Sequence, residues 1–267
     1  MGILDRFDLT GQAAIITGAG TGLGREMALS MAEAGCDIVG VGRRAEPIEA
    51  VGEEVRALGR RYLGCPGTDV TDSSQVNAMV ARAIESMGRI SILINNAGLG
   101  GNTNRPLTEL TDEDWRGGMA ANLDSAFYCS RAIVPHLLEH GGGRIINVSS
   151  VRGYRMRGGP NNYTYAVSKA AVIQFTNALA MSYARDNIRV TCIAPGPFPK
   201  TDDMDAFAAM GKVYPSGRPG FLREIGPLAV FLASPASEYM SGETILMDGG
   251  SVAAGVIPSG LVPRAEG

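Results

Sequence analysis

The sequence predicts an α/β fold, a single doubly wound domain in which helices cover both faces of a parallel sheet of about seven strands. Short apolar runs alternate with helical stretches from near the start of the chain to about residue 250. Strands that are apolar at consecutive positions are covered on both faces, which is typical of parallel sheets. No linker or shift in composition divides the 267 residues. We therefore assign residues 1–250 to one domain and residues 251–267 to a C-terminal tail.

The predicted strands are the short apolar runs. They are Ala13–Thr17, Asp37–Val41, Tyr62–Cys65 (the weakest), Ile90–Asn95, Arg144–Val148, Arg189–Ile193 and Thr244–Met247. The predicted helices lie between them and are Gly24–Ala34, Pro47–Leu58, Ser73–Met87, Asp112–Glu139, Tyr163–Arg185 and Leu222–Ala233. The tail has no periodicity, and its Leu261–Arg264 (LVPR) resembles part of a protease-cleavable linker, although Leu261–Gly267 could equally be native.

Composition excludes several classes of protein. Apolar residues make up 45% of the chain and charged residues 19%, which excludes wholesale disorder. The 24 basic and 27 acidic residues give a net charge of −3, whereas nucleic-acid and anionic-membrane binders normally carry a basic excess. No run of about 18 apolar residues could span a bilayer, and the first residues lack the apolar centre of a secretory signal. We therefore expect no nucleic-acid and no membrane partner.

Cysteine and histidine usage indicates a cytoplasmic protein without a metal site. The four cysteines are scattered without CxxC spacing, at Cys36, Cys65, Cys129 and Cys192. Such a pattern is typical of reduced thiols in the core of a cytosolic protein. The two histidines, His136 and His140, leave few candidate ligands for zinc.

Glycine is abundant, with 36 residues, and its most informative cluster follows the first predicted strand. There Gly18-Ala19-Gly20-Thr21-Gly22-Leu23-Gly24 opens a helix. Glycines let a ligand approach the backbone closely, while free N–H groups and the helix dipole attract an anion. A tight turn without a ligand would also recruit glycine, but its place after the first strand favours a site for a diphosphate.

The glycines at 18, 22 and 24 form the pattern TGxxxGxG rather than GxGxxG. With this pattern the chain resembles the classical short-chain dehydrogenase/reductase family over residues 8–250. Asp69-Val70 stands where the family contacts adenine, and Asn95-Asn96-Ala97-Gly98 follows the fourth strand. The resemblance implies a Rossmann fold and a nicotinamide coenzyme. It also implies coenzyme contacts from Gly18, Thr21, Gly22, Leu23, Gly24, Asp69, Val70, Asn96, Ala97, Gly98, Tyr165, Lys169, Pro195, Gly196, Phe198 and Thr201.

The end of the second strand indicates which coenzyme is preferred. A carboxylate there would accept the ribose hydroxyls of NAD, but the strand ends in Arg43-Arg44, and Asp37 stands at its other end. Two guanidinium groups suit a 2′-phosphate, which arginine binds through paired hydrogen bonds. We therefore predict NADP(H), with NAD(H) as the alternative. Arg43 and Arg44 could instead be solvated residues that begin the next helix.

Tyr165 and Lys169 stand four residues apart at the start of a predicted helix, so both side chains lie on one face. A free tyrosine titrates near pH 10, and a nearby ammonium stabilises the phenolate, which makes the phenol a usable proton donor and acceptor. Such pairs also occur by chance on helix surfaces. The resemblance adds Ser150, whose hydroxyl would bind the substrate oxygen, and Asn122, which would hold a water in a proton relay. It implies hydride transfer with proton transfer through Tyr165, without a metal.

Two departures from the family pattern bear on the substrate. The segment before Tyr165 is about two residues longer than usual, and it contains Arg152, Tyr154, Arg155, Met156 and Arg157. These residues could recognise a carboxylate or phosphate, or form a solvated basic loop. The PGxxxT turn of the family reads Pro195-Gly196-Pro197-Phe198-Pro199-Lys200-Thr201, so Thr201 stands one place late. The segment that follows, Asp202–Phe221, is the expected lid.

Within the family, Ala34–Gly40 (AGCDIVG) and Ala57–Tyr62 (ALGRRY) resemble the 2-deoxy-D-gluconate 3-dehydrogenase and gluconate 5-dehydrogenase-like members. We therefore expect a sugar-acid-like or other small ketone or secondary alcohol as substrate. A 3-oxoacyl thioester reductase would use the same catalytic residues and is the alternative. A nicotinamide-sensing protein without turnover would have no need of the tyrosine and lysine. The resemblance also implies a homotetramer that packs through the two long helices.

Overall fold

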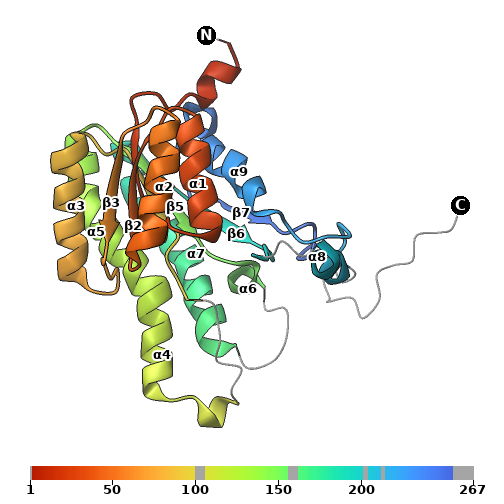
Figure 1. Ribbon diagram of the computed structural model, residues 1–267. Helices are drawn as coiled ribbons and strands as arrows, with labels where there is room; N and C mark the ends of the chain where they lie inside the picture. The colour runs from red at the N-terminus through yellow and green to blue at the C-terminus, as the bar shows by residue number, and fades with distance from the viewer. Residues whose placement is uncertain (1, 100–105, 156–161, 201–203, 212–213, 255–267) are drawn as a thin grey trace, which may run out of the picture.

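The predicted α/β fold is confirmed by the computed structural model, which describes residues 2–99, 106–155, 162–200, 204–211 and 214–254 (Figure 1). Seven parallel strands form one sheet in the order β3-β2-β1-β4-β5-β6-β7. The strands are β1 (Ala13–Thr17), β2 (Asp37–Gly42), β3 (Tyr62–Pro66), β4 (Ile92–Asn95), β5 (Gly143–Val148), β6 (Ile188–Pro195) and β7 (Thr244–Met247).

Helices cover both faces of the sheet, as predicted. The α-helices of the described residues are α1 (Gly22–Glu33), α2 (Ala45–Ala57), α3 (Ser73–Met87), α4 (Asp112–Met119), α5 (Ser125–Glu139), α6 (Val151–Tyr154), α7 (Tyr163–Tyr183), α8 (Met204–Gly211) and α9 (Ile225–Ala233). One apolar core joins the sheet to α1, α2 and α9, and a second joins the other face to α3, α5 and α7. Strands buried on both faces explain the apolar runs in the sequence.

The strand order places a crevice at the carboxyl edge of the sheet. The chain starts in the middle at β1, runs outward to β3, and then returns to pair β4 with β1 on its other side. Because consecutive crossovers leave β1 and β4 in opposite directions, a ligand can enter between them at their carboxyl ends.

The single helix predicted over Asp112–Glu139 is interrupted in the structure. A π-helical turn, Ala120–Asp124, separates α4 from α5. Asn122 is buried in the middle of this turn. The apolar pattern runs through both helices and gives no signal of a turn that is one residue wider. The helix predicted over Leu222–Ala233 likewise begins as a 3₁₀ turn, Leu222–Glu224, before α9.

The cysteines and the helices of the structure bear on two expectations from composition. The four cysteines are free and buried. Burial raises the pKa of Cys129 to about 12 and that of Cys192 to about 11, so both are neutral thiols in the core. In the described part of the chain, none of the helices combines the length and the apolarity needed to cross a bilayer.

Candidate active site

The turn between β1 and α1 takes a conformation that requires glycine. Gly18 and Gly22 have positive φ angles of 68° and 59°. A Cβ atom at Gly24 would collide with the carbonyl oxygen of Gly18, so the turn and the helix are in direct backbone contact. No side chain caps α1 at Thr21, and its first turn holds no acidic residue. The first N–H groups of α1 therefore remain available to bind an anion.

Asn96 braces this turn from the neighbouring strand β4. Its side-chain amide donates to the carbonyl oxygens of Thr17 and Gly18 at 3.0 and 3.3 Å. The backbone N–H groups of Asn96 and Ala97 donate to the Thr17 hydroxyl at 3.0 and 2.9 Å. The sequence predicted both residues as coenzyme contacts, and the structure adds that they hold the glycine-rich turn in place.

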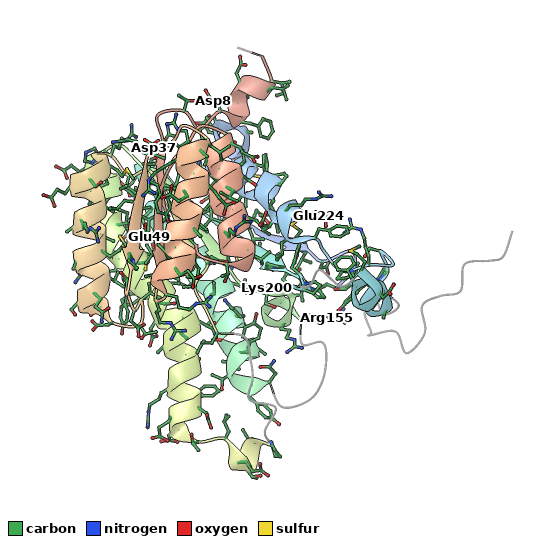
Figure 2. All side chains as sticks on the ribbon, in the orientation of Figure 1. Asp8, Asp37, Glu49, Arg155, Lys200 and Glu224 are labelled. Carbon is green, nitrogen blue, oxygen red and sulfur yellow. The ribbon has the colours of Figure 1, made fainter. Side chains whose placement is uncertain are left out.

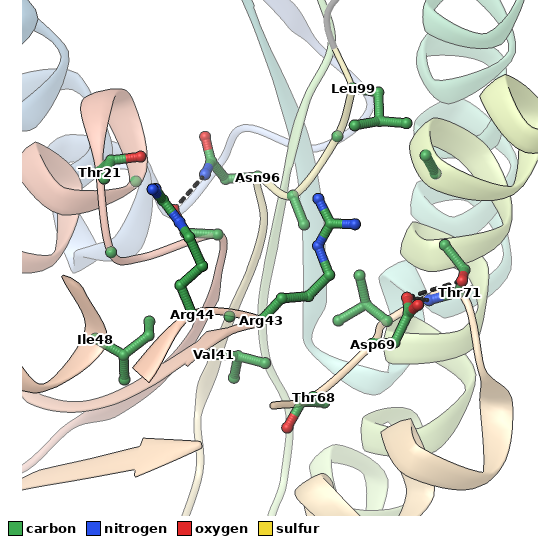
Figure 3. Close-up of a pocket in the computed structure, with 18 of the residues that line it drawn as sticks. Thr21, Val41, Arg43, Arg44, Ile48, Thr68, Asp69, Thr71, Asn96 and Leu99 are labelled. Carbon is green, nitrogen blue, oxygen red and sulfur yellow. Dashed lines mark hydrogen bonds between the residues drawn. The ribbon is translucent and has the colours of Figure 1, made fainter. Parts of the chain in front are cut away.

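A pocket of about 830 Å³, here called the glycine-turn pocket, opens at the carboxyl edge of the sheet (Figure 3). Arg43 and Arg44 extend into it from the end of β2. Among the described residues, no carboxylate forms an ion pair with either guanidinium group. The predicted coenzyme residues that line this pocket are Gly18, Thr21, Leu23, Gly24, Arg43, Arg44, Asp69, Val70, Asn96, Ala97 and Gly98.

Asp69 presents a fixed, ionised carboxylate on the wall of the glycine-turn pocket. Its Oδ1 accepts hydrogen bonds from the backbone N–H and the hydroxyl of Thr71, at 2.9 and 2.8 Å. These bonds hold the pKa of Asp69 below its ordinary value, and the charge of Arg43 adds to the effect. A carboxylate held in this way suits a ligand group that donates hydrogen bonds.

A second cavity of about 210 Å³, here called the tyrosine cavity, brings together the four predicted catalytic residues. Its lining includes Asn122, Ser150, Tyr165 and Lys169, together with the predicted coenzyme contacts Pro195, Gly196 and Phe198. Four residues line both this cavity and the glycine-turn pocket: Leu23, Asn96, Gly98 and Leu99. The two spaces therefore adjoin, so one extended ligand could occupy both.

Lys169 carries its ammonium into the interior of the protein. Its side chain is almost fully buried, and Nζ donates to the carbonyl oxygen of Val148 at 2.8 Å. Nζ lies 5.9 Å from the centre of the Tyr165 ring. Burial lowers the pKa of Lys169 to about 8, because a charged group is less stable away from water.

Asn122 lines the tyrosine cavity from the π turn, close to the Lys169 ammonium. Its Oδ1 accepts a hydrogen bond from the backbone N–H of Leu99 at 3.1 Å. A Cβ atom at Gly98 would lie 2.6 Å from Asn122 Oδ1 and 3.3 Å from Lys169 Nζ. Asparagine and lysine thus meet over a position that only glycine can occupy. The N–H of Leu99 is a contact that the sequence did not indicate.

The two serines at the end of β5 have different roles. Ser149 donates its hydroxyl proton to the carbonyl oxygen of Lys169 at 2.6 Å, which ties β5 to α7. Ser150 precedes α6, and its Oγ accepts a hydrogen bond from the backbone N–H of Arg152 at 3.2 Å. That contact leaves the proton of Ser150 available to a ligand in the tyrosine cavity.

The predicted substrate residues lie near the tyrosine cavity but not in its lining. Arg152 is half-buried in α6, and Tyr154 and Arg155 are exposed at its end (Figure 2). Met156 lies outside the described residues, as do Thr201, Arg157 and Leu261–Gly267. Lys200, which the sequence analysis did not single out as a site residue, lines the glycine-turn pocket. The shifted register of Thr201 was the one signal that could have drawn attention to it.

One cluster of metal-ligand types lies far from this site. His136, Glu139 and His140, at the end of α5, have ligand atoms within 4.8 Å of one another. Nε2 of His136 already accepts the N–H of Ile90 at 3.1 Å, and Nδ1 of His140 contacts the carbonyl oxygen of His136 at 2.8 Å. Since α5 ends at the amino edge of the sheet, this cluster plays no part in the tyrosine cavity.

Comparison with known proteins decides the family. The model of the short chain dehydrogenase family matches residues 12–210. The chain belongs to the short-chain dehydrogenase family. A 2-dehydro-3-deoxy-D-gluconate 5-dehydrogenase of Dickeya dadantii is 40% identical over 258 residues, covering 94% of this chain and 99% of the relative. This chain is therefore an NAD(P)-dependent dehydrogenase that acts on CH–OH groups.

Relatives with different activities are similar to this chain along nearly its whole length. A gluconate 5-dehydrogenase of Gluconobacter oxydans is 34% identical, covering 92% of this chain and 96% of the relative. A 3-oxoacyl-[acyl-carrier-protein] reductase of Thermotoga maritima is also 34% identical, covering 91% of this chain and 99% of the relative. The sugar-acid resemblance noted in the sequence is confirmed. Sequence identity distinguishes the sugar-acid dehydrogenases from the 3-oxoacyl reductase only slightly, with 40% and 34% against 34%.

Solved structures of this family share the fold over nearly the whole chain. A gluconate 5-dehydrogenase from Burkholderia cenocepacia J2315, in complex with NADP and tartrate, has a TM-score of 0.85 and 34% identity, covering 94% of this chain and 99% of that one. A 7α-hydroxysteroid dehydrogenase complexed with NADH and a 7-oxo bile acid has a TM-score of 0.86 and 33% identity, covering 96% and 99%. The short-chain dehydrogenases with this fold thus bind either nicotinamide coenzyme.

Replacement of Lys169 by methionine is expected to stabilise the fold near neutral pH. A pKa lowered to about 8 in the folded state means that protonated Lys169 destabilises the fold by about 3 kcal/mol below that pH. Loss of the hydrogen bond to Val148 offsets about 1 kcal/mol of the gain. The folded protein binds fewer protons than the unfolded chain between pH 8 and about 10.5, so the advantage of the variant should fade as pH rises through this window. Urea unfolding of both proteins at pH 7 and pH 10 measures it. A variant that is less stable by the same amount at both pH values would contradict the expectation.

Proposed function

We propose that this chain transfers hydride between NADP(H) and a ketone or secondary alcohol, and that Tyr165 donates or accepts the proton. One observation supports this most strongly. Tyr165, Lys169, Ser150 and Asn122 come from α7, the end of β5 and the π turn, yet they line one cavity that adjoins the glycine-turn pocket. A phenol, a hydroxyl and an ammonium are the groups that proton transfer to a carbonyl oxygen requires.

The glycine-turn pocket fits a dinucleotide. The open N-terminus of α1 suits the diphosphate, and the carboxylate of Asp69 suits the amino group of adenine. Arg43 and Arg44, which form no ion pair with a described carboxylate, suit a 2′-phosphate. A nicotinamide coenzyme bound here would supply or accept the hydride at the tyrosine cavity.

The residues of the tyrosine cavity divide the remaining work. In ketone reduction the Tyr165 hydroxyl donates its proton to the substrate oxygen, and the Ser150 hydroxyl donates a hydrogen bond to the same oxygen. The Lys169 ammonium, 5.9 Å from the ring centre, stabilises the negative charge left on the phenolate. Leu99 fixes the amide of Asn122, which by family resemblance holds a water through which the proton is replaced.

The substrate that we infer is a sugar acid or a similar small hydroxy or keto acid. The dehydrogenases of Dickeya dadantii and Gluconobacter oxydans support it by their names and their similarity along the whole chain. Arg152 lies two residues from Ser150, and the exposed Arg155 follows. A positive charge near the cavity mouth would favour a carboxylate. The 3-oxoacyl reductase of Thermotoga maritima keeps a thioester reductase as the second candidate.

Tyr165→Phe is expected to reduce turnover by about 10²–10⁴-fold, because it keeps the ring and removes the proton. The measurement is NADPH oxidation with a panel of keto sugar acids and, separately, with an acetoacetyl thioester. Tyr163→Phe is the matched control, since Tyr163 lies on the same helix and the residue four positions later is Val167. Near-normal turnover by Tyr165→Phe would contradict the proton-transfer role, and a preference for the thioester would contradict the sugar-acid assignment.

Arg43→Ala and Arg44→Ala are expected to weaken NADPH binding by about 10- to 100-fold and to change NADH binding little. Each removes charged hydrogen bonds that only the 2′-phosphate can accept. Quenching or enhancement of coenzyme fluorescence on titration gives both dissociation constants. The control is Arg185→Ala, an exposed arginine at the amino edge of the sheet. Equal loss for NADH and NADPH, or a wild-type preference for NADH, would contradict the NADP(H) assignment.

We also infer that residues 1–250 form one catalytic domain and that the protein is a cytoplasmic homotetramer. The buried free thiols support a reducing compartment. Apolar side chains are exposed on the helices expected to pack between subunits, with Phe127 40%, Val167 45% and Met181 82% exposed. Size-exclusion chromatography with light scattering should give about four times the chain mass of 27.9 kDa. A monomer at micromolar concentration would contradict this assembly.

A further inference from the structure

Lys200 reaches the glycine-rich turn from the segment after β6, far along the chain from the turn itself. It follows the end of β6, whereas the glycine turn, the arginines and Asp69 follow β1, β2 and β3. Its Nζ donates to the Thr21 hydroxyl at 3.2 Å. We propose that Lys200 binds the diphosphate of the coenzyme and so fastens the segment after β6 over the bound dinucleotide. This assignment rests on the dinucleotide site proposed above.

The contact between Lys200 and the turn is close along the whole end of the side chain. A Cβ atom at Gly22 would collide with Lys200 Cε and lie 3.0 Å from Nζ. Gly22 therefore meets two requirements at once, a positive φ of 59° and space for the lysine. In Figure 2, Lys200 lies beside the end of α1 at which the helix begins. The ammonium thus stands beside the first turn of α1, within reach of an anion bound there.

The electrostatics at this point call for a negative ligand. Lys200 forms no ion pair with a carboxylate among the described residues, and its hydrogen-bond partner Thr21 is a neutral hydroxyl. The N-terminus of α1 adds partial positive charge, and neither a side-chain cap nor an acidic residue in the first turn offsets it. An exposed ammonium beside an open helix N-terminus pairs well with a diphosphate, which carries two negative charges at neutral pH.

The identity of the residue also departs from the family pattern. In PGxxxT the sixth position is threonine, and in this chain that position is Lys200, with Thr201 one place later. A threonine there offers a neutral hydroxyl. Lysine offers a charge on a side chain long enough to cross to Thr21. The shift in register therefore exchanges a neutral contact for a charged one.

The segment that carries Lys200 also lines the tyrosine cavity. Gly196 and Phe198 contribute to that cavity, and the ring of Phe198 packs directly against Gly220. The N–H of Gly220 donates to the carbonyl oxygen of Pro197 at 3.0 Å, which joins this segment to the end of the expected lid. Fastening Lys200 to the diphosphate would hold Phe198 at the tyrosine cavity, so coenzyme binding would prepare the substrate side.

Lys200 and the arginine pair make separable predictions, because they address different parts of one ligand. A diphosphate contact affects NADH, NADPH and ADP-ribose alike, and it leaves 2′-AMP, which lacks a diphosphate, unaffected. Arg43 and Arg44 affect the ligands with a 2′-phosphate only. Lys200→Met removes the charge at nearly constant length, and Lys200→Arg keeps it.

The experiment is a titration of wild type, Lys200→Met, Lys200→Arg and the charge-matched control Arg185→Met with NADPH, NADH, ADP-ribose and 2′-AMP. We expect Lys200→Met to weaken the three diphosphate ligands by about tenfold and 2′-AMP by less than twofold, with the arginine variant near wild type. Dissociation constants come from fluorescence and calorimetry, so turnover is not needed. Unchanged NADPH affinity in Lys200→Met, or an equal loss for 2′-AMP, would overturn the assignment. A wild-type protein that binds none of the four ligands would instead overturn the proposed dinucleotide site.

Amine labelling gives an independent measurement. The chain has three lysines, Lys169, Lys200 and Lys212, and Lys169 is buried. Acetylation followed by mass spectrometry of the peptides therefore reports Lys200 directly. We expect ADP-ribose to slow modification of Lys200 by about tenfold and 2′-AMP to leave it unchanged. Equal labelling rates with and without ADP-ribose, at concentrations that saturate the protein, would overturn the contact.

Discussion

Two hydrogen bonds between the end of β5 and α7 determine where the chemistry of this protein takes place. The Lys169 ammonium donates to the carbonyl oxygen of Val148, and the Ser149 hydroxyl donates to the carbonyl oxygen of Lys169. Together they fix the helix against the strand at both the side chain and the backbone of one residue. These two hydrogen bonds also position Tyr165, which lies one helical turn before Lys169, and Ser150, which directly follows Ser149. Burial of the Lys169 ammonium lowers the free energy of unfolding, so the site reduces the stability of the fold.

Much of this arrangement could be predicted from the sequence, because it follows from local patterns. Consecutive apolar residues identify the buried strands, and their alternation with helices fixes a parallel sheet. Active groups then gather at the carboxyl edge for topological reasons. Tyr165 and Lys169 share a helix face whatever surrounds them, so their proximity needed no tertiary information. Asn122 and Ser150 required the family resemblance, since nothing in their neighbours points toward a shared cavity.

The features that escaped prediction depend on contacts between distant segments. In the π turn, Asn122 contacts Leu99 and Gly98, which lie more than twenty residues earlier in the chain. Lys200 and Thr21 are 179 residues apart, and no local pattern relates them. Arg152 and Arg155 were expected near the substrate because they stand in the lengthened segment between Ser150 and Tyr165. Their place in the sequence does not say which way each side chain points or how deeply it is buried. Helix propensity and periodicity carry no information on such pairings.

The π turn makes the junction of α4 and α5 intolerant of a change in length. An α-helix advances by about 100° per residue, so removing one residue between Ala120 and Asp124 would restore regular winding and improve the local backbone bonding. The same deletion would swing every side chain on one flank round the helix axis, away from its present neighbours. Either Asn122 would lose its hydrogen bond with the N–H of Leu99, or the apolar face of α5 would rotate out of the core. The number of residues between α4 and α5 is therefore constrained from two sides, by the apolar core under α5 and by the contact of Asn122 with Leu99.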